Sequence, residues 1–205
     1  MGVIPTRMMP MGAWRKSAPP LPYDAEVEYV KSDGTQWTDT GIVATGATTT
    51  TLDARMISTA TRNSGFFGAY SSGRAYYLYL DASGVFQFGF GAYKNSSNSS
   101  NTRRHVFELD DYQFLVDGTV AGTTSRNAFS TPWTLAMFKT RSSASAFYAA
   151  PPVEVYGCQI SQSGTLARDF IPVRVGTAGA LYDRVSGTLY YSATSTALIP
   201  GPDLP

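Results

Sequence analysis

The tyrosines of the segment Tyr76-Tyr77-Leu78-Tyr79 are the residues whose type and spacing most directly suggest a chemical role. If the segment is a β-strand, its alternation places Tyr77 and Tyr79 on one face and Tyr76 and Leu78 on the other. Aromatic rings held rigidly on a strand stack against the apolar faces of pyranose rings, so Tyr77 and Tyr79 are candidate glycan-binding residues. The alternative is structural, with one face in the core and the other an ordinary β-surface, and this is the commoner origin of such a stripe.

Residues suited to catalysis or metal binding are few. His105 is the only histidine, so neither a His-rich metal site nor a Ser-His-Asp triad can be argued, and we expect it to be structural or solvent-exposed. Cys158 is the only cysteine, and its strand-like surroundings predict a small buried hydrophobe. We assign no cofactor and no metal ligand, although calcium stays open because four aspartates could supply oxygen ligands together with backbone carbonyls. These aspartates are Asp33, Asp39, Asp81 and Asp117.

Residues 1–22 differ in composition from the rest of the chain. Five prolines in this stretch block both a helix and a central strand, so we predict an extended N-terminal arm. Methionine side chains adapt to irregular surfaces, and a purely solvated tail would not usually contain several of them together with a tryptophan. The candidate partner-docking residues are Met8, Met9, Met11 and Trp14. The alternative for this segment is a disordered terminus.

Composition favours an all-β domain and excludes some partners. The 205 residues include 13 Tyr, 11 Phe and 19 Gly, which suit pleated surfaces and turns. The net charge of +1 argues against a general nucleic-acid-binding surface, which needs clustered Lys and Arg. No apolar run approaches the roughly 20 residues of a membrane span, and no signal-peptide core follows the N-terminus.

The elements that must position these residues are short strands separated by turns. Residues 47–57 alternate over a long strand, with Thr48, Thr50, Leu52, Ala54 and Met56 on one face. Further hairpins are predicted around residues 81–84, 110–111, 161–164 and 185–187, and residues 133–138 are predicted to form another strand. Residues 94–101 are predicted to be a polar loop. Such spacing means a β-sandwich or a barrel, with no domain boundary after residue 23.

The opening stretch, residues 27–42, reads as a strand, an Asp33-Gly34 turn and a second strand. We interpret Tyr29 and Trp37 as core residues of these first strands, which are expected to lie near the closing hairpin Leu181–Tyr191. The predicted hairpin marks where the arm ends and the folded domain begins.

Three segments together resemble the concanavalin A-like lectin/glucanase superfamily, in its laminin-G-like branch. They are Val27-Glu28-Tyr29-Val30-Lys31-Ser32-Asp33-Gly34-Thr35-Gln36-Trp37-Thr38-Asp39-Thr40-Gly41-Ile42, the hairpin from His105 to Gly118, and the closing pair Gly164-Thr165-Leu166-Ala167-Arg168-Asp169-Phe170-Ile171-Pro172-Val173 and Gly179-Ala180-Leu181-Tyr182-Asp183-Arg184-Val185-Ser186-Gly187-Thr188-Leu189-Tyr190-Tyr191. The resemblance covers about residues 23–200 and implies a jelly-roll sandwich. It also implies a typical setting among virion surface proteins, adhesins and appended modules, but no catalytic site.

Glycosidases on that scaffold share a strand motif of alternating acids, Glu-x-Asp-x-x-Glu, in which one carboxylate is the nucleophile and another the acid. Here Glu108 and Asp110 match the first two positions, but Gln113 occupies the third and cannot donate a proton as the acid does. We therefore interpret these residues as turn and rim residues and predict no enzyme. Activity on β-glucans remains a third and more distant hypothesis.

These observations predict an all-β, jelly-roll β-sandwich of two antiparallel sheets with an extended arm: arm 1–22, jelly roll 23–200 and C-terminal tail 201–205. The predicted function is a non-enzymatic phage structural or decoration protein of the head or a fibre, on the virion surface and made in the host cytoplasm without a signal peptide. Its arm would bind other virion proteins, and its sandwich could bind host or mucosal glycans. We also expect a homo-oligomer, and neither nucleic acid nor membrane as partner. The alternative is a carbohydrate-binding adhesin module of a bacterial surface protein.

Overall fold

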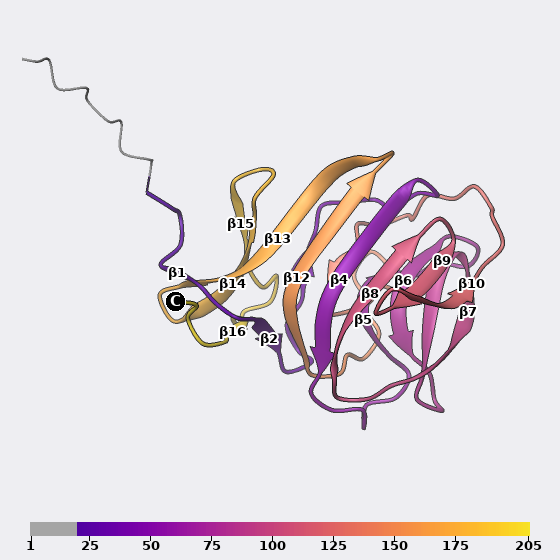
Figure 1. The fold of residues 1–205 in the computed structure, drawn as a ribbon, viewed down its shortest axis with the longest axis horizontal. Helices are drawn as coiled ribbons and strands as arrows, with labels where there is room; N and C mark the ends of the chain where they lie inside the picture. The colour runs from indigo at the N-terminus through magenta and orange to yellow at the C-terminus, as the bar shows by residue number, and fades with distance from the viewer. Residues whose placement is uncertain (1–19) are drawn as a thin grey trace, which may run out of the picture.

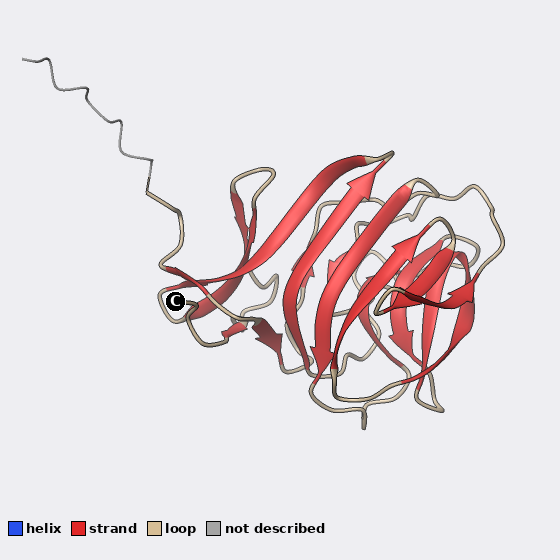
Figure 2. Ribbon diagram, viewed as in Figure 1, coloured by secondary structure: helices blue, strands red, loops and turns tan. Residues whose placement is uncertain are grey.

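Short antiparallel strands joined by tight turns make up the part of the chain that the computed structural model describes, residues 20–205 (Figure 2). The predicted docking residues Met8, Met9, Met11 and Trp14 lie outside the described residues. Between residues 20 and 205 there is no helix, and hence none long and apolar enough to cross a membrane. The prediction of an all-β sandwich of two antiparallel sheets is confirmed.

The larger sheet has eleven strands and is the broad layer in front in Figure 1. Its main path runs in the order β10 (Thr119–Thr123), β9 (Gln113–Val116), β8 (Arg104–Asp110), β4 (Thr48–Met56), β12 (Val153–Gln162), β13 (Thr165–Val175), β14 (Ala178–Asp183) and β15 (Thr188–Tyr190). Three short strands join it at the sides, namely β1 (Ala25–Glu26) on β13, β2 (Val30–Ser32) on β12, and β16 (Ile199–Pro200) on β2.

The smaller sheet has five strands and packs behind the larger one (Figure 1). Its order is β3 (Thr38–Asp39), β11 (Ala136–Met137), β5 (Ser64–Ala69), β6 (Ala75–Leu80) and β7 (Val85–Ser99). Strand β6 pairs with β7 through the turn at Asp81, with Tyr77 opposite Gly89 and Tyr79 opposite Gln87. This confirms the predicted hairpin around residues 81–84.

The core lies between the two sheets and is rich in phenylalanine. Strand β4 alternates buried and half-buried residues along its whole length, which confirms the face predicted from Thr48 to Met56. From the small sheet, Tyr76 and Leu78 are buried in the same cluster, opposite Phe107 and Phe114 of the large sheet. Because each strand presents one face to this core, the other face of each sheet is the outer surface of the sandwich.

The opening stretch is not a hairpin, and that prediction was wrong. Strand β2 pairs with β12 in the large sheet, whereas β3 pairs with β11 in the small one, so the turn at Asp33-Gly34 carries the chain from one sheet to the other. Gly34 has φ of 101°, and a Cβ there would lie 2.7 Å from the carbonyl oxygen of Ala150. The turn is closed from inside by Gln36, whose side-chain oxygen accepts hydrogen bonds from the Ser32 hydroxyl and the Asp33 N–H.

The assignment of Trp37 and Tyr29 to the core was also wrong. Both are half-buried, and the fully buried residues beside Trp37 are the polar Gln36 and Thr38. The Trp37 ring instead packs on Phe147, with 4.3 Å between ring centroids. Its backbone carbonyl accepts a hydrogen bond from Ala193 N–H, so this stretch does lie next to the closing segment, as expected.

Two further boundaries differ from the prediction. Residues 94–101 were expected to form a polar loop, but β7 continues to Ser99, held by hydrogen bonds such as that from the Ser97 hydroxyl to the carbonyl of Ala121. The strand expected over 133–138 is reduced to two residues, because β11 is flanked by Phe138 at φ of 70°. Composition alone indicates polarity, and it does not reveal a distant strand that supplies hydrogen bonds.

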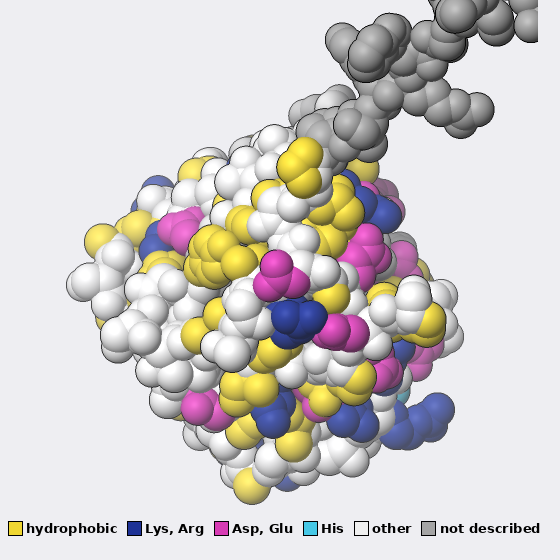
Figure 3. Space-filling model, turned by 90° about the vertical axis from the view of Figure 1, so that its left-hand side faces the viewer, with side chains coloured by type: hydrophobic (Ala, Val, Ile, Leu, Met, Phe, Trp, Pro, Cys, Tyr) yellow, Lys and Arg dark blue, Asp and Glu magenta, His cyan; other side chains and the backbone are white. Residues whose placement is uncertain are grey.

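The two ends of the described chain lie side by side against the large sheet. The predicted C-terminal tail, residues 201–205, hydrogen-bonds to the first strands, from Glu28 N–H to the Pro202 carbonyl and from Leu204 N–H to the Glu26 carbonyl. Arg174 joins them with a bidentate ion pair to Asp203. Seen from this side, the surface mixes hydrophobic side chains with charges of both signs (Figure 3).

Candidate functional site

A pocket lined by tyrosines lies on the outer face of the small sheet. It encloses about 270 Å³ and is open to solvent. Eight residues line it: Asn63, Tyr70, Tyr77, Tyr79, Asp81, Gln87, Tyr93 and Tyr148. We call this the tyrosine pocket. Strand alternation brings Tyr77 and Tyr79 here together, on the face opposite Tyr76 and Leu78, as the sequence predicted.

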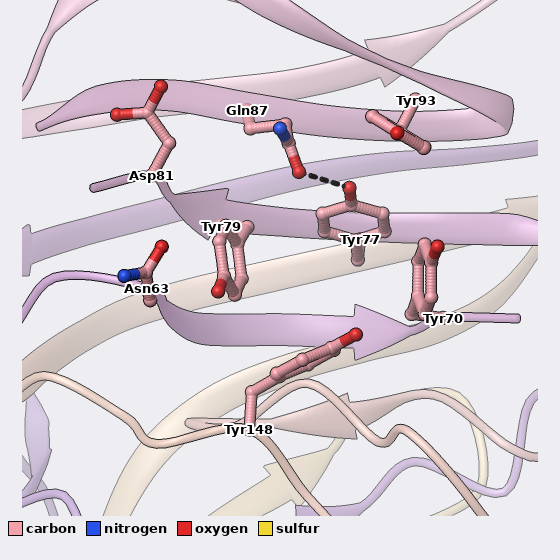
Figure 4. Close-up of a pocket in the computed structure, with 8 residues that line it drawn as sticks. All are labelled: Asn63, Tyr70, Tyr77, Tyr79, Asp81, Gln87, Tyr93 and Tyr148. Atoms are coloured by element: carbon pink, nitrogen blue, oxygen red, sulfur yellow. Dashed lines mark hydrogen bonds between the residues drawn. The ribbon is translucent and has the colours of Figure 1, made fainter. Parts of the chain in front are cut away.

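The five rings form the walls of a box. Figure 4 shows Tyr77 between Tyr79 and Tyr70, with Tyr148 crossing below and Tyr93 above. Successive rings meet nearly edge to face, at 82° for Tyr70–Tyr77, 90° for Tyr77–Tyr79 and 73° for Tyr79–Tyr148, with centroids 5.2 to 5.9 Å apart. Edge-to-face contacts are the favoured arrangement of aromatic pairs, so neighbouring rings stabilise one another's orientation.

The floor under Tyr77 depends on a glycine. Gly89 lies opposite Tyr77 on β7, and a Cβ at that position would lie 2.6 Å from two atoms of the Tyr77 ring and 2.7 Å from the Cβ of Ala75. Only a residue without a side chain leaves room for the ring to lie flat across the strand. Tyr77 is consequently only 2% exposed, while Tyr93 at the rim is 58% exposed.

A directed chain of hydrogen bonds runs along one side of the pocket. The Tyr77 hydroxyl donates to Gln87 Oε1 at 2.5 Å, Gln87 Nε2 donates to Asn95 Oδ1 at 2.9 Å, and Asn95 Nδ2 donates to Asp81 Oδ2 at 3.0 Å. The other carboxylate oxygen of Asp81 accepts from the Ser83 hydroxyl and from the N–H groups of Ser83 and Val85. The β6–β7 turn thus fixes the last acceptor of the chain.

Burial and neighbours shift the pKa values of the pocket in opposite directions. Burial, followed by the other tyrosines, raises the pKa of Tyr77 well above its ordinary value, and burial also raises the pKa values of Tyr79 and Tyr148. Burial alone would raise the pKa of Asp81, but the hydrogen bonds from Ser83, Val85 and Gly84 outweigh it and lower that pKa. At neutral pH Tyr77, Tyr79 and Tyr148 are therefore neutral, and Asp81 is ionised.

The residues of the glycosidase-like pattern lie elsewhere. Glu108 and Asp110 project from β8 on the outer face of the large sheet, and Asp110 is paired across the hairpin with Gln113. None of the three lines the tyrosine pocket, which is on the opposite side of the sandwich. The structure therefore does not bring these carboxylates together with the aromatic site.

His105 and Cys158 are both buried at positions where they stabilise the fold. His105 is buried, with Nδ1 2.8 Å from Asp117 Oδ2 and Nε2 2.9 Å from Asn101 Oδ1, so it ties β8 to the β9–β10 turn. Cys158 is buried on the core face of β12, and burial raises the pKa of its thiol far above the ordinary value. The prediction that Cys158 is a small buried hydrophobe is confirmed.

The four aspartates considered for calcium are distributed among separate turns. Asp33 accepts from Thr35, Asp39 from Gly41 and Thr134, and Asp117 from Val106. Within residues 20–205 no group of three or more His, Cys, Asp or Glu side chains is arranged to hold a metal ion. These carboxylates stabilise turns in the described part of the chain.

Sequence reasoning missed most of the pocket. Tyr70 follows β5, Tyr148 comes from the long segment after β11, and Tyr93 and Asn95 lie in the part of β7 that was predicted to be entering a loop. The alternation Gln87, Gly89, Gly91, Tyr93, Asn95 along β7 would have placed the last two on the face of Tyr77, had the strand been extended past Phe90. Nothing local in the sequence signals Tyr148.

No family model matches this chain, and neither a curated protein nor a solved structure matches it significantly. The resemblance to the concanavalin A-like superfamily therefore remains a prediction from three sequence segments.

Proposed function

We propose that this protein is a non-catalytic carbohydrate-binding β-sandwich and that its ligand site is the tyrosine pocket. The observation that carries the proposal is the box of five tyrosine rings around an open hollow, beside two amides and one carboxylate. A sugar ring has apolar C–H faces and a rim of hydroxyls, so a binding site for it needs aromatic rings for the faces and polar side chains for the hydroxyls. An ordinary solvent-exposed β-surface has no reason to arrange five rings around an empty space.

The setting that we propose is the virion of a phage, with the protein as a structural or decoration component of the head or a fibre. This proposal rests on the resemblance of the three sequence segments and on the composition of residues 1–22. In it, Met8, Met9, Met11 and Trp14 anchor the arm to another virion protein, and the sandwich presents its pocket to host or mucosal glycans. An adhesin module of a bacterial surface protein is the alternative, and the pocket supports both equally.

Glycan binding is tested on an array with the wild-type protein and the Tyr93→Ala variant. Tyr93 is exposed at the rim, so its removal leaves the core intact while taking away one wall of the pocket. We expect repeatable binding by the wild type that is lost or greatly weakened in Tyr93→Ala. The control is Tyr191→Ala, which removes a 47% exposed tyrosine that does not line the pocket. Equal binding by all three proteins would refute the pocket as the site.

The setting is tested separately by deleting residues 1–22. The deletion ends before Asp24, whose N–H bonds to Arg174 and starts the pairing of the sandwich. The virion proposal expects a truncated protein that folds, as seen by circular dichroism, and no longer joins particles. Particles that contain the truncated protein in normal amounts would contradict the anchoring role of the arm. Glycan binding by the sandwich should survive the truncation in either setting, so particle assembly is the measurement that decides.

A further inference from the structure

The pocket is lined by aromatic rings, two side-chain amides and one carboxylate. Asp81 is the only charged side chain among the described residues that line it, and no Lys or Arg is among them. The basic residue Arg62 lies over Gly84 at the neighbouring turn, and its guanidinium donates to the Ser100 hydroxyl. The electrostatic character of the pocket is therefore set by one carboxylate and five rings.

The hydrogen-bond chain determines which groups face a ligand. An ionised Asp81 can only accept, so Asn95 must present its NH₂ group to it and its oxygen to Gln87. Gln87 must then present its NH₂ group to Asn95 and its oxygen to the Tyr77 hydroxyl, which must donate. Since the Tyr77 proton is used within the protein, the Tyr77 oxygen has only lone pairs left for a ligand.

The aromatic rings add to the same preference. The faces of tyrosine rings carry the negative part of the π quadrupole and attract a cation placed within about 6 Å of the ring centroid. Because the rings of Tyr70, Tyr77, Tyr79 and Tyr148 meet at steep angles, a group in the hollow is near several of them at once. Acceptors, π faces and a carboxylate together favour a ligand group that is both a donor and positively charged.

We infer that the tyrosine pocket binds the protonated amino group of an amino sugar, as in a de-N-acetylated glucosamine polymer. This inference rests on the proposed carbohydrate-binding function and names the class of sugar. The ammonium group provides three donors and a charge for Asp81 and the rings, while the pyranose face stacks on a tyrosine. A neutral sugar has hydroxyl donors but no charge, an N-acetylated sugar has lost the charge, and an acidic sugar meets Asp81 without a cation to offset it.

Calorimetry with three matched trisaccharides tests the inference. They are the β-1,4-linked trimers of glucosamine, of N-acetylglucosamine and of glucose, which differ only at the 2-position. We expect the glucosamine trimer to bind at least about tenfold more tightly than the other two at about pH 6, since cation–π contacts and a charged partner act together. Equal affinities, a preference for a neutral trimer or binding of none overturns the inference. These results leave the proposed function standing, which is overturned separately by a failure on every glycan of the array or by equal binding of the wild type and Tyr93→Ala.

Asp81→Asn identifies the source of the preference. The substitution keeps the size of the side chain and removes its charge, so the ratio of the affinities for the glucosamine and glucose trimers should fall at least about threefold. Asp110→Asn, the same change on the opposite face, should leave the ratio unchanged. An unchanged ratio in Asp81→Asn contradicts the inferred role of the carboxylate.

The wild-type protein gives a second test that does not depend on how the variant folds. Raising the pH from about 6 to about 9 deprotonates the ligand amine, while Tyr77 and Tyr79, whose pKa values are raised by burial, stay neutral. Affinity for the glucosamine trimer should then fall to that for the glucose trimer, which should itself stay constant. A glucosamine affinity that does not change with pH overturns the inference.

Discussion

The two outer faces of the sandwich are both built by strand alternation, but they carry different side chains. On the large sheet, neighbouring strands carry opposite charges that neutralise each other, in the pairs Arg55–Glu154, Arg104–Asp53 and Arg184–Asp169, each at 2.7 Å. On the small sheet, the pocket has five tyrosines and a single carboxylate. The outer face of the large sheet also has a hollow, of about 260 Å³, but the charged side chains that line it include the ion-paired Asp169 and Arg184. Among the described residues, the single charged side chain that lines the tyrosine pocket is Asp81.

Tyr156 shows that a tyrosine on a strand is not by itself a binding residue. It lies on the outer face of the large sheet, where the Arg104 guanidinium covers its ring at 3.8 Å and its hydroxyl donates to Glu154. Both the face and the hydroxyl of Tyr156 thus have partners within the protein. In the pocket the rings contact mainly one another, edge to face, and among the described residues no guanidinium lies over any of them, so the rings that line the hollow can still contact a ligand there.

The largest difference between the two sheets is expected when one glycine on each sheet is replaced by alanine. In Gly89→Ala the new methyl group collides with the Tyr77 ring, so we expect a loss of about 2 kcal/mol in the free energy of unfolding and loss of sugar binding as the ring is displaced. Gly157→Ala is the matched change on the large sheet, where the nearest atom would be the Phe170 carbonyl oxygen at 3.6 Å. Urea unfolding and calorimetry compare the two, and equal effects would refute the close fit under Tyr77.

Removal of one buried charge should affect the large sheet without affecting the pocket. Glu154 is 4% exposed and accepts hydrogen bonds from Arg55 Nε and the Tyr156 hydroxyl. We expect Glu154→Gln to lower the free energy of unfolding by about 2 kcal/mol, because charge-assisted hydrogen bonds are lost in a buried place. Sugar affinity should not change.

Glu108→Gln is the control for Glu154→Gln, since it makes the same chemical change at a half-buried side chain with no ion pair among the described residues. We expect its stability to remain within about 0.5 kcal/mol of the wild type. The variant also tests the hypothesis of a glycosidase. Activity on β-glucans in the wild type that disappears in Glu108→Gln would contradict the proposal of a non-catalytic protein.

The smallest effect is expected from the pH dependence of stability at the pocket. Hydrogen bonds lower the pKa of Asp81 in the folded state, so its contribution is fully present above the unfolded pKa of about 3.9 and is lost as the pH falls through the folded value. Below about pH 4 the wild type should therefore lose more stability than Asp81→Asn, by less than about 1 kcal/mol because Asp81 is partly exposed. Urea midpoints at several acidic pH values measure this, and parallel curves would contradict it.

How far the sequence predicts the structure differs between segments. The alternation from Thr48 to Met56 and the hairpin between Leu80 and Val85 were predicted correctly, because period-two patterning and turn residues are local signals. The opening stretch was predicted wrongly for the same reason. Asp33-Gly34 does specify a turn. Whether the flanking strands pair with each other or join different sheets depends on their partners β12 and β11, which lie far away in the chain.

Two of the eight residues that line the pocket could be predicted as a pair from the sequence, and the rest required the fold. Placing Tyr77 and Tyr79 on one face needs only the alternation of a single strand. Their use as parts of a box needs Tyr70 and Tyr148 from other segments, and it needs Gly89 at the position opposite Tyr77. The position of Gly89 opposite Tyr77 is set by strand register, and a slip of one residue would move every side chain of the strand to the other face of the sheet.

The sequence by itself determined that this chain is all β and, with one exception, where its clearest turns fall. It also determined that Tyr77 and Tyr79 share a face. Only the tertiary structure decided that this face is the outside of the small sheet, that three further tyrosines surround it, and that a chain of hydrogen bonds from Tyr77 to Asp81 runs along one side of the pocket. The physical reason is that alternation and turn geometry act over a few residues, whereas a pocket is formed by strands that meet only after the chain has folded.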